Sequence, residues 1–328
     1  MLNVLVTGGA GFIGSHLVRA LLGRGYPVRV LDNFTTGCLD NLEEVLTRIE
    51  LIDGDVRKRD TVRAAVKGVE IIFHLAALPS VQRSMKDPVS TAQVNEMGTL
   101  NVLDAALHAR ARRVVFASSS SIYGDGAEEM RRETMPARPL SPYALSKWVG
   151  EQYASLYARV FGLETVALRY FNVFGPRQDP SSQYSAVIPR FIAAFSAGDQ
   201  PVIYGNGDQF RDFTYVENVV QANLLAATVP GISGHVFNVG CGQTLTLNAL
   251  HRRLADLLRV CDPPRYQPAR NGEVRFSKAD ITLARDVLGY APNVNVQEGL
   301  RRTVEWFLSS QEGRKADAVE TSSRALPL

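Results

Sequence analysis

Tyr143 and Lys147 are the residues of this sequence whose types and spacing best suit proton transfer. They stand four apart near the start of a predicted helix over Pro142–Phe161, so their side chains share one face. A phenol with a pKa of about 10 is a poor base at neutral pH. Adjacent positive charge stabilises the phenolate and lowers that pKa. The pair therefore predicts a tyrosine base assisted by a lysine ammonium, although this spacing also occurs by chance.

A hydroxyl-rich run precedes this helix and gives the pair a chemical setting. Ser118, Ser119, Ser120 and Ser121 follow a predicted strand over residues 113–117. Ligands of parallel sheets bind at the carboxyl edge, where the strands end. We therefore expect the serines and the tyrosine–lysine pair to meet at one edge of such a sheet.

A glycine-rich turn from Gly8 to Gly14 directly follows the first predicted strand and opens the first helix. Glycine is needed there because the chain turns tightly and its backbone approaches a diphosphate, which sits on the N–H groups of the helix N-terminus. Asp32 ends the second strand, 18 residues after Gly14, where a carboxylate accepts bonds from adenosine ribose hydroxyls. Asn33 and Phe34 follow, with no arginine to neutralise a 2′-phosphate. The sequence therefore predicts NAD binding rather than NADP binding.

Short β-rich runs alternate with longer helical patterns through the first half of the chain. This rhythm predicts an α/β fold, a doubly wound parallel (Rossmann) sheet with helices on both faces. Beyond residue 171, proline and glycine become frequent and the strands become isolated. We expect an NAD-binding domain over 1–171, with a strand near 236–239 returning to its sheet, and a smaller interleaved C-terminal α/β substrate domain over 172–308. Residues 309–328 are predicted to form a polar, aperiodic tail.

The composition excludes several other classes of protein. A net charge of +3 without a basic block argues against nucleic-acid binding, and no apolar run reaches the ~18 residues of a membrane span. Glycines interrupt the apolar start, which also lacks basic residues, so we expect no signal peptide and a cytoplasmic location. The three cysteines and five histidines lack metal-ligand or disulfide spacing, so we expect no metal site.

Together these motifs resemble the extended short-chain dehydrogenase/reductase family over residues 1–308. Within it the chain is most similar to nucleotide-sugar 4-epimerases, particularly the branch acting on UDP-N-acetylhexosamines. The resemblance implies tightly held NAD, and it places at Ser119 the hydroxyl that hydrogen-bonds the 4-hydroxyl of the sugar. It implies that the cofactor-binding residues are Gly8, Gly11, Phe12, Ile13, Gly14, Asp32, Asn33, Asp55, Val56, Leu75, Ala76, Ala77, Asn95, Tyr143, Lys147 and Phe171.

Ser120 and Ser121 bear on which reaction follows oxidation at carbon 4. Resembling dehydratases and decarboxylases carry a glutamate at the position of Ser121, and the dehydratases add an aspartate at that of Ser120. A hydroxyl cannot replace a carboxylate as a proton carrier near neutral pH. The resemblance therefore favours epimerisation: Tyr143 takes the 4-hydroxyl proton, hydride passes to NAD, the 4-keto sugar turns, and the hydride returns.

The C-terminal half matches the family's sugar-nucleotide contacts in their order along the chain. The resemblance implies that the substrate-binding residues are Ser80, Ser119, Ser121, Tyr143, Asn172, Val187, Tyr204, Arg211, Arg270, Glu273 and Ser277. Asn172 and the two arginines would hold the diphosphate. Val187 and Tyr204 belong to the uridine loops, and Glu273 would accept ribose hydroxyls. Ser277 replaces the bulky tyrosine of enzymes restricted to UDP-glucose and UDP-galactose, which leaves room for an N-acetyl group.

Other hypotheses stay open at this point. A UDP-glucuronate 4-epimerase, or a 4-epimerase restricted to UDP-glucose, would share this machinery, and the sequence does not locate a group that recognises a 6-carboxylate. A non-enzymatic NAD(P)-sensing protein of the same fold commonly lacks the tyrosine or the lysine. Helices predicted over 91–109 and Pro142–Phe161 carry apolar residues beyond one stripe. The resemblance implies that these helices pair between subunits in a homodimer.

Overall fold

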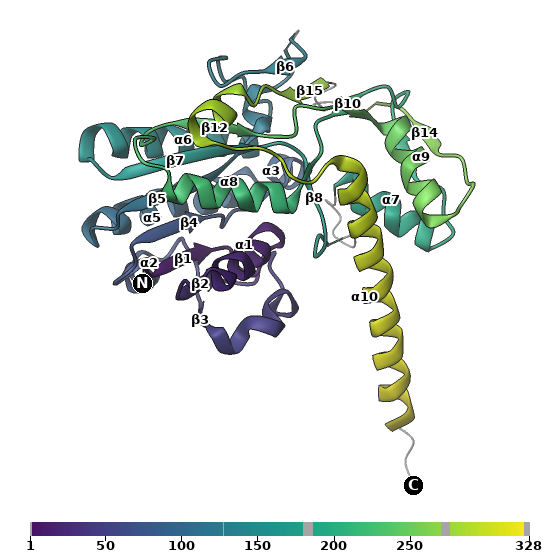
Figure 1. The fold of residues 1–328 in the computed structure, drawn as a ribbon, viewed down its shortest axis with the longest axis horizontal. Coiled ribbons are helices and arrows are strands. Elements are labelled where there is room, and N and C mark those ends of the chain that lie inside the picture. The colour runs from purple at the N-terminus through teal and green to yellow at the C-terminus, as the bar shows by residue number, and fades with distance from the viewer. Residues whose placement is uncertain (1, 127, 180–185, 270–275, 325–328) are drawn as a thin grey trace.

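A parallel sheet of seven strands forms the centre of the molecule (Figure 1). The computed structural model describes residues 2–126, 128–179, 186–269 and 276–324. The strand order is β12-β7-β5-β4-β1-β2-β3 with every neighbouring pair parallel, which confirms the predicted doubly wound α/β fold. These strands are β1 Val4–Thr7, β2 Val28–Asp32, β3 Ile49–Asp53, β4 Ile71–His74, β5 Arg113–Ser119, β7 Glu164–Tyr170 and β12 Val236–Val239.

Helices cover both faces of this sheet, which explains why its strands are apolar without alternation. In β1, Val4 and Val6 belong to a core shared with α1 and α8, whereas Leu5 belongs to a core shared with α2, α5 and α6. The helices and helical turns are α1 Phe12–Gly23, η1 Leu39–Arg48, α2 Arg59–Val66, α3 Val81–Lys86, α4 Pro88–Ala92, η2 Gln93–Met97, α5 Gly98–His108, η3 Ser120–Tyr123, α6 Pro142–Phe161, α7 Val187–Ser196, α8 Val216–Thr228, α9 Leu247–Leu258, η4 Ala284–Leu288 and α10 Val296–Arg324.

The strand order reverses at β1, which lies between β2 and β4. Loops that follow neighbouring strands diverge at such a point, so a crevice opens at the carboxyl edge of the sheet. Gly8 follows β1, Leu75 follows β4 and Ser119 ends β5. The fold therefore brings the predicted cofactor and catalytic segments to the same edge.

Short strands and three helices, α7, α9 and α10, build a second region around its own apolar core. The two regions interleave along the chain, because β6 from the first half pairs with β15, and β12 from the second half pairs with β7. The remaining strands are β6 Met130–Arg131, β8 Val173–Phe174, β9 Val202–Tyr204, β10 Phe210–Arg211, β11 Thr214–Tyr215, β13 Leu245–Thr246, β14 Arg265–Gln267 and β15 Phe276–Ala279.

Two predicted helical boundaries differ from the structure. The single helix expected over 91–109 is instead α4, a π-helical turn (η2) and α5. The polar, aperiodic tail predicted from residue 309 lies within α10, which continues to Arg324 and extends away from the body of the molecule (Figure 1). Alanine, glutamate, lysine and arginine in that stretch favour helix without any apolar period. Across the described residues, no helix has both the length and the apolar character needed to span a membrane.

Candidate active site

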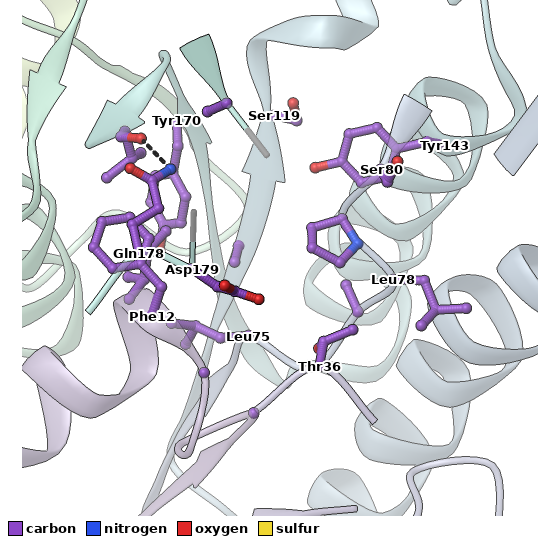
Figure 2. Close-up of a pocket in the computed structure, with 18 of the residues that line it drawn as sticks. Phe12, Thr36, Leu75, Leu78, Ser80, Ser119, Tyr143, Tyr170, Gln178 and Asp179 are labelled. Atoms are coloured by element: carbon purple, nitrogen blue, oxygen red, sulfur yellow. Dashed lines mark hydrogen bonds between the residues drawn. The ribbon is translucent and has the colours of Figure 1, made fainter. Parts of the chain in front are cut away.

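A cavity of about 1540 Å³ lies at the carboxyl edge of the seven-stranded sheet. Common small-molecule sites occupy roughly 300–1,000 Å³, so this one has room for a dinucleotide and a second ligand. Figure 2 shows side chains from both halves of the chain around it, among them Phe12, Ser119, Tyr143 and Gln178. The sequence-predicted residues that line it are Gly8, Gly11, Phe12, Ile13, Gly14, Asp32, Asn33, Val56, Leu75, Ala76, Ala77, Ser80, Ser119, Ser121, Tyr143, Lys147, Asn172, Val187, Tyr204, Arg211 and Ser277.

The glycine-rich turn allows the end of β1 to pack closely against β4 and α1. Gly8 has a φ of +73°, and a Cβ there would lie 2.7 Å from the backbone nitrogen of Ala76. At Gly14, a Cβ would overlap the carbonyl oxygen of Gly8. The bare backbone therefore leaves the N-terminus of α1, with Gly11 as its N-cap, open to the cavity. Such a terminus fits the diphosphate of a dinucleotide.

Asp32 is held at the end of β2 by the backbone of two loops. Its Oδ2 accepts the N–H of Ala10 at 2.9 Å, and its Oδ1 accepts the N–H of Phe34 at 2.9 Å. Burial raises the pKa of Asp32, and the backbone hydrogen bonds oppose that rise. A carboxylate has about four acceptor positions, so this one retains capacity for ribose hydroxyls.

Lys147 is buried beneath the cavity on α6, with 5% of its surface exposed. Its Nζ donates to the carbonyl oxygen of Ala117 in β5 at 2.8 Å and lies 5.2 Å from the centroid of the Phe116 ring. Burial lowers the pKa of Lys147 to about 8. The ammonium is therefore fixed in place. It loses its proton at a pH not far above neutral.

Ser119 is oriented toward Tyr143 by its neighbour Ser121. The Oγ of Ser119 accepts the backbone N–H of Ser121 at 3.2 Å and its hydroxyl at 2.9 Å. Its own proton therefore remains available for the phenol oxygen of Tyr143 or for a substrate hydroxyl. Burial raises the pKa of Tyr143, and the nearby hydroxyl of Ser119 opposes the rise. The protein alone thus keeps Tyr143 a phenol, and further positive charge is needed to favour its phenolate.

Arg211 and Ser277 lie opposite each other in the parallel pair β10–β15 at the far side of the cavity. Asp212, the next residue, is fully buried, and burial raises its pKa to about 6. Its backbone oxygen also accepts the Nδ2 of Asn172 at 3.1 Å. Three backbone N–H groups donate to the Asp212 carboxylate at 2.8–3.1 Å, those of Cys241, Gly242 and Ala279. Asp212 therefore joins the segments that carry Asn172, Arg211 and Ser277.

Residues 4–240 match the NAD dependent epimerase/dehydratase family. This chain belongs to that family. The family has NAD as its cofactor, and the glycine turn, the N-terminus of α1 and Asp32 fit it. Family membership confirms the resemblance found in the sequence motifs.

Known members of the family match the chain along most of its length. The UDP-glucose 4-epimerase of Mycolicibacterium smegmatis is 40% identical over 315 residues, which cover 95% of this chain and 100% of that protein. The structure of Thermotoga maritima UDP-glucose 4-epimerase with UDP-glucose has a TM-score of 0.91 and 37% identity, covering 94% of this chain and 100% of that one. UDP-N-acetylglucosamine 4-epimerase from Methanobrevibacter ruminantium, in complex with UDP-N-acetylmuramic acid, has a TM-score of 0.90 and 40% identity, covering 94% and 99%.

Phe171, the predicted nicotinamide contact, is not among the residues that line the cavity. It is fully buried, and its ring centroid lies 6.2 Å from that of Tyr123. Tyr170, one residue earlier, lines the cavity instead (Figure 2). Adjacent residues of an extended chain point in opposite directions, so only one of the two side chains can face the ligand.

Other predicted ligand residues lie behind the cavity wall or outside the described residues. Asn95 is 2% exposed and bonds to other protein groups. Asp55 faces a neighbouring cavity of about 390 Å³, where hydrogen bonds from Arg57 lower its pKa to about 2. Arg270 and Glu273 lie outside the described residues.

Glu151 and Arg169 form a buried ion pair below the end of β5, which was not predicted from the sequence. Arg169 donates from Nη2 and Nε to the two carboxylate oxygens of Glu151 at 2.8 and 2.9 Å, and from Nη1 to the hydroxyl of Tyr123 at 2.8 Å. The hydroxyl of Ser118 donates to the same carboxylate. The pair therefore fixes the strand end that carries the serines. Its one sequence signal is the position of Glu151, one helical turn after Lys147.

Gln178 and Asp179 also line the cavity and were not predicted. The Nε2 of Gln178 donates to the carbonyl oxygen of Val173 at 3.3 Å, while its buried Oε1 has no partner in the described part of the chain. Figure 2 shows Asp179 across the cavity from Tyr143. Both residues follow soon after β8 in the chain. Their position after this segment is the sequence signal from which they could have been predicted. Over the same described residues, no cluster of three or more His, Cys, Asp or Glu side chains is arranged to hold a metal.

Proposed function

We propose that this chain catalyses the NAD-dependent 4-epimerisation of UDP-hexoses, with UDP-GlcNAc and UDP-GalNAc as its preferred pair. The hydroxyl cluster at the end of β5 carries the proposal. There the hydroxyl of Ser119 is close enough to Tyr143 to lower the pKa of its phenol, and hydroxyls at Ser120 and Ser121 stand where elimination or decarboxylation needs a carboxylate. The names of similar proteins, UDP-glucose and UDP-N-acetylglucosamine 4-epimerase, support the same reaction.

Tyr143 is the base for the 4-hydroxyl of the sugar in this mechanism, and Ser119 holds that hydroxyl beside the phenol. The Lys147 ammonium, fixed by its bond to Ala117, contributes positive charge that favours the phenolate. When bound, NAD supplies the hydride acceptor for carbon 4 and further positive charge. Tyr143 returns the proton when the hydride comes back to the opposite face of the sugar.

Return to the opposite face requires the 4-keto sugar to turn while its nucleotide stays bound. Anchoring must therefore be strong at the diphosphate and uridine and loose at the sugar ring. Arg211 and Asn172 are proposed to hold the diphosphate, and Val187 and Tyr204 to lie beside the uridine. This assignment keeps residues 1–171 as the NAD-binding part and 172–308 as mainly the substrate-binding part.

Ser277 supports the preference for N-acetylated sugars. It lies on the cavity wall opposite Arg211 in the strand pair, and the residue is small and only 7% exposed. A tyrosine side chain at this position would fill the space that an N-acetyl group at carbon 2 needs. The UDP-N-acetylglucosamine 4-epimerase from Methanobrevibacter ruminantium, at 40% identity, is consistent with that substrate class.

Turnover of three UDP-sugars tests the proposal. We expect UDP-GlcNAc to be converted to UDP-GalNAc, with UDP-glucose as a weaker substrate and UDP-glucuronate unchanged. Activity confined to UDP-glucose or to UDP-glucuronate would contradict the substrate assignment. A protein that binds NAD but turns over none of the three would instead be a dinucleotide sensor.

Replacing Ser277 sharpens this test. Ser277→Tyr is expected to abolish conversion of UDP-GlcNAc while UDP-glucose is still converted, because only the acetylated sugar needs the lost space. Retained UDP-glucose turnover also shows that the variant folds. Ser196→Tyr, at an exposed position at the end of α7, is the control and is expected to change neither activity. Equal loss of both activities in Ser277→Tyr would contradict the proposed role.

A second copy of this chain is the proposed partner. Large apolar side chains are exposed along α3, α4 and η2 and on the neighbouring α6, and such a contiguous surface favours association. They are Met85, Val89, Met97, Leu145, Leu156 and Val160. Sedimentation is expected to give the mass of a homodimer, and a monomer at micromolar concentration would contradict it.

A further inference from the structure

His74 is a polar ring buried between the cofactor edge of the sheet and the catalytic helix. It ends β4, directly before the cavity-lining Leu75 (Figure 2), and only 1% of its surface is exposed. Both ring nitrogens are paired: Nδ1 lies 2.7 Å from the Oγ1 of Thr7, and Nε2 lies 3.0 Å from the Oγ1 of Thr99. A buried polar ring of this kind stabilises the fold only if each of its nitrogens, and each group that bonds to them, has its hydrogen bonds formed.

The partners determine which ring nitrogen carries the proton. Thr99 donates its only hydroxyl proton to the carbonyl oxygen of Asn95 at 2.5 Å, so its oxygen must accept from His74 Nε2–H. A neutral imidazole has one N–H, which leaves Nδ1 to accept the hydroxyl proton of Thr7. Thr7 in turn accepts the backbone N–H of Ala76 at 3.3 Å. Burial and the nearby charge of Lys147 lower the pKa of His74 to about 3, so the ring is neutral.

The chain of hydrogen bonds continues from Asn95 to the catalytic helix. Asn95 lies in the π-helical turn η2, and its Oδ1 accepts the N–H of Leu78 at 2.8 Å. Its Nδ2 donates to the Oγ of Ser146 at 3.0 Å, and Ser146 donates to the backbone oxygen of Tyr143 at 2.8 Å. One ordered path thus runs from Ala76, beside the glycine-rich turn, to the backbone of Tyr143.

We propose that His74, as the neutral tautomer protonated at Nε2, is a positioning residue that holds the helix bearing Tyr143 and Lys147 in register with the NAD-binding strands. The inference rests on the proposed function, because it assumes that Tyr143 acts on a substrate placed against NAD. Reactive groups need placement to within a fraction of an ångström, and an error of about 1 Å can cost roughly a hundredfold in rate. A directional path of hydrogen bonds fixes this placement more tightly than apolar packing alone.

A matched pair of threonine variants tests the role. Thr99→Val removes the acceptor of His74, whereas Thr303→Val removes a similar buried hydroxyl that bonds to the carbonyl four residues earlier in α10 and does not line the cavity. Thr99→Val is expected to lower kcat for UDP-GlcNAc about tenfold, with KM and bound NAD changed less than about twofold. Thr303→Val is expected to leave all three quantities unchanged. Thr99→Ser, which keeps the hydroxyl, is expected to restore kcat.

The outcomes separate failure of the inference from failure of the proposed function. Wild-type turnover with an unchanged kcat in Thr99→Val overturns the role of His74 alone, as does a loss of kcat that follows a loss of bound NAD. Absence of turnover in the wild-type protein overturns the proposed function and this inference with it. Nitrogen NMR of histidine-labelled protein, with His74→Phe to identify the signal, gives a readout that needs no activity. A ring protonated at Nδ1, or one that titrates between about pH 5 and 8, would contradict the tautomer.

Discussion

The two sides of the cavity are supported in different ways. On the cofactor side, Gly8 and Ser119 follow or end parallel strands of four to seven residues, and the buried Glu151–Arg169 pair supports the strand end. On the other side, Arg211 lies on a strand of two residues, and the carboxylate of Asp212 holds three backbone segments together. Long strands thus position the residues that act in the reaction on the cofactor side. One polar side chain positions the residues that anchor the substrate on the other side, called here the anchoring side. The two sides should therefore fail differently when they are altered.

The largest expected effect lies on the cofactor side. Tyr143→Phe removes the proposed base, so kcat for UDP-GlcNAc is expected to fall by about 10²- to 10⁴-fold, with KM changed less than about twofold. Steady-state kinetics measure both constants. Tyr153→Phe, on the same helix, is the control and should keep the wild-type kcat. If Tyr143→Phe retained more than about a tenth of kcat, another group would have to be the base.

A smaller effect of a different kind is expected on the anchoring side. Asp212→Asn replaces a charged acceptor of three N–H groups with an amide in which one oxygen becomes an NH2 donor group, so the segments bearing Arg211 and Ser277 lose part of their support. KM for UDP-GlcNAc is expected to rise about tenfold while kcat changes less than about twofold. A lowered kcat at unchanged KM would show that the two sides are not separable in this way. Thermal unfolding of the variant checks that it is folded at the assay temperature.

The smallest expected effect is a dependence of kcat on pH, which comes from Lys147 on the cofactor side. Burial lowers the pKa of Lys147 to about 8, so its ammonium is present below that pH and is lost above it. We expect kcat to fall as the pH rises through about 8. The contribution of this lysine to stability has the opposite sign. Its pKa is lower in the folded state than in the unfolded state, so folding becomes more favourable as the pH rises from about 8 toward the ordinary pKa of lysine. A kcat that stays constant to about pH 10 would contradict the role of the ammonium.

The sequence predicted the cofactor side better than the anchoring side, for physical reasons. Gly8, Asp32 and Tyr143 belong to local patterns, in which a strand, a turn and a helix follow one another within a few residues. The partners of Asp212 lie 29 to 67 residues away along the chain, and no local sequence pattern predicts contacts between such distant residues. The burial of Phe171 behind the cavity wall was not predictable for a similar reason, because a shift of one residue at a strand end reverses the face that a side chain occupies.

The central claim is that the hydride removed from carbon 4 returns to carbon 4. The most direct measurement uses UDP-GlcNAc carrying deuterium at that carbon, followed by NMR and mass spectrometry of the product. We expect UDP-GalNAc of unchanged composition with the deuterium still at carbon 4. A product that has lost water, or deuterium that has moved to another carbon or to solvent, would contradict it.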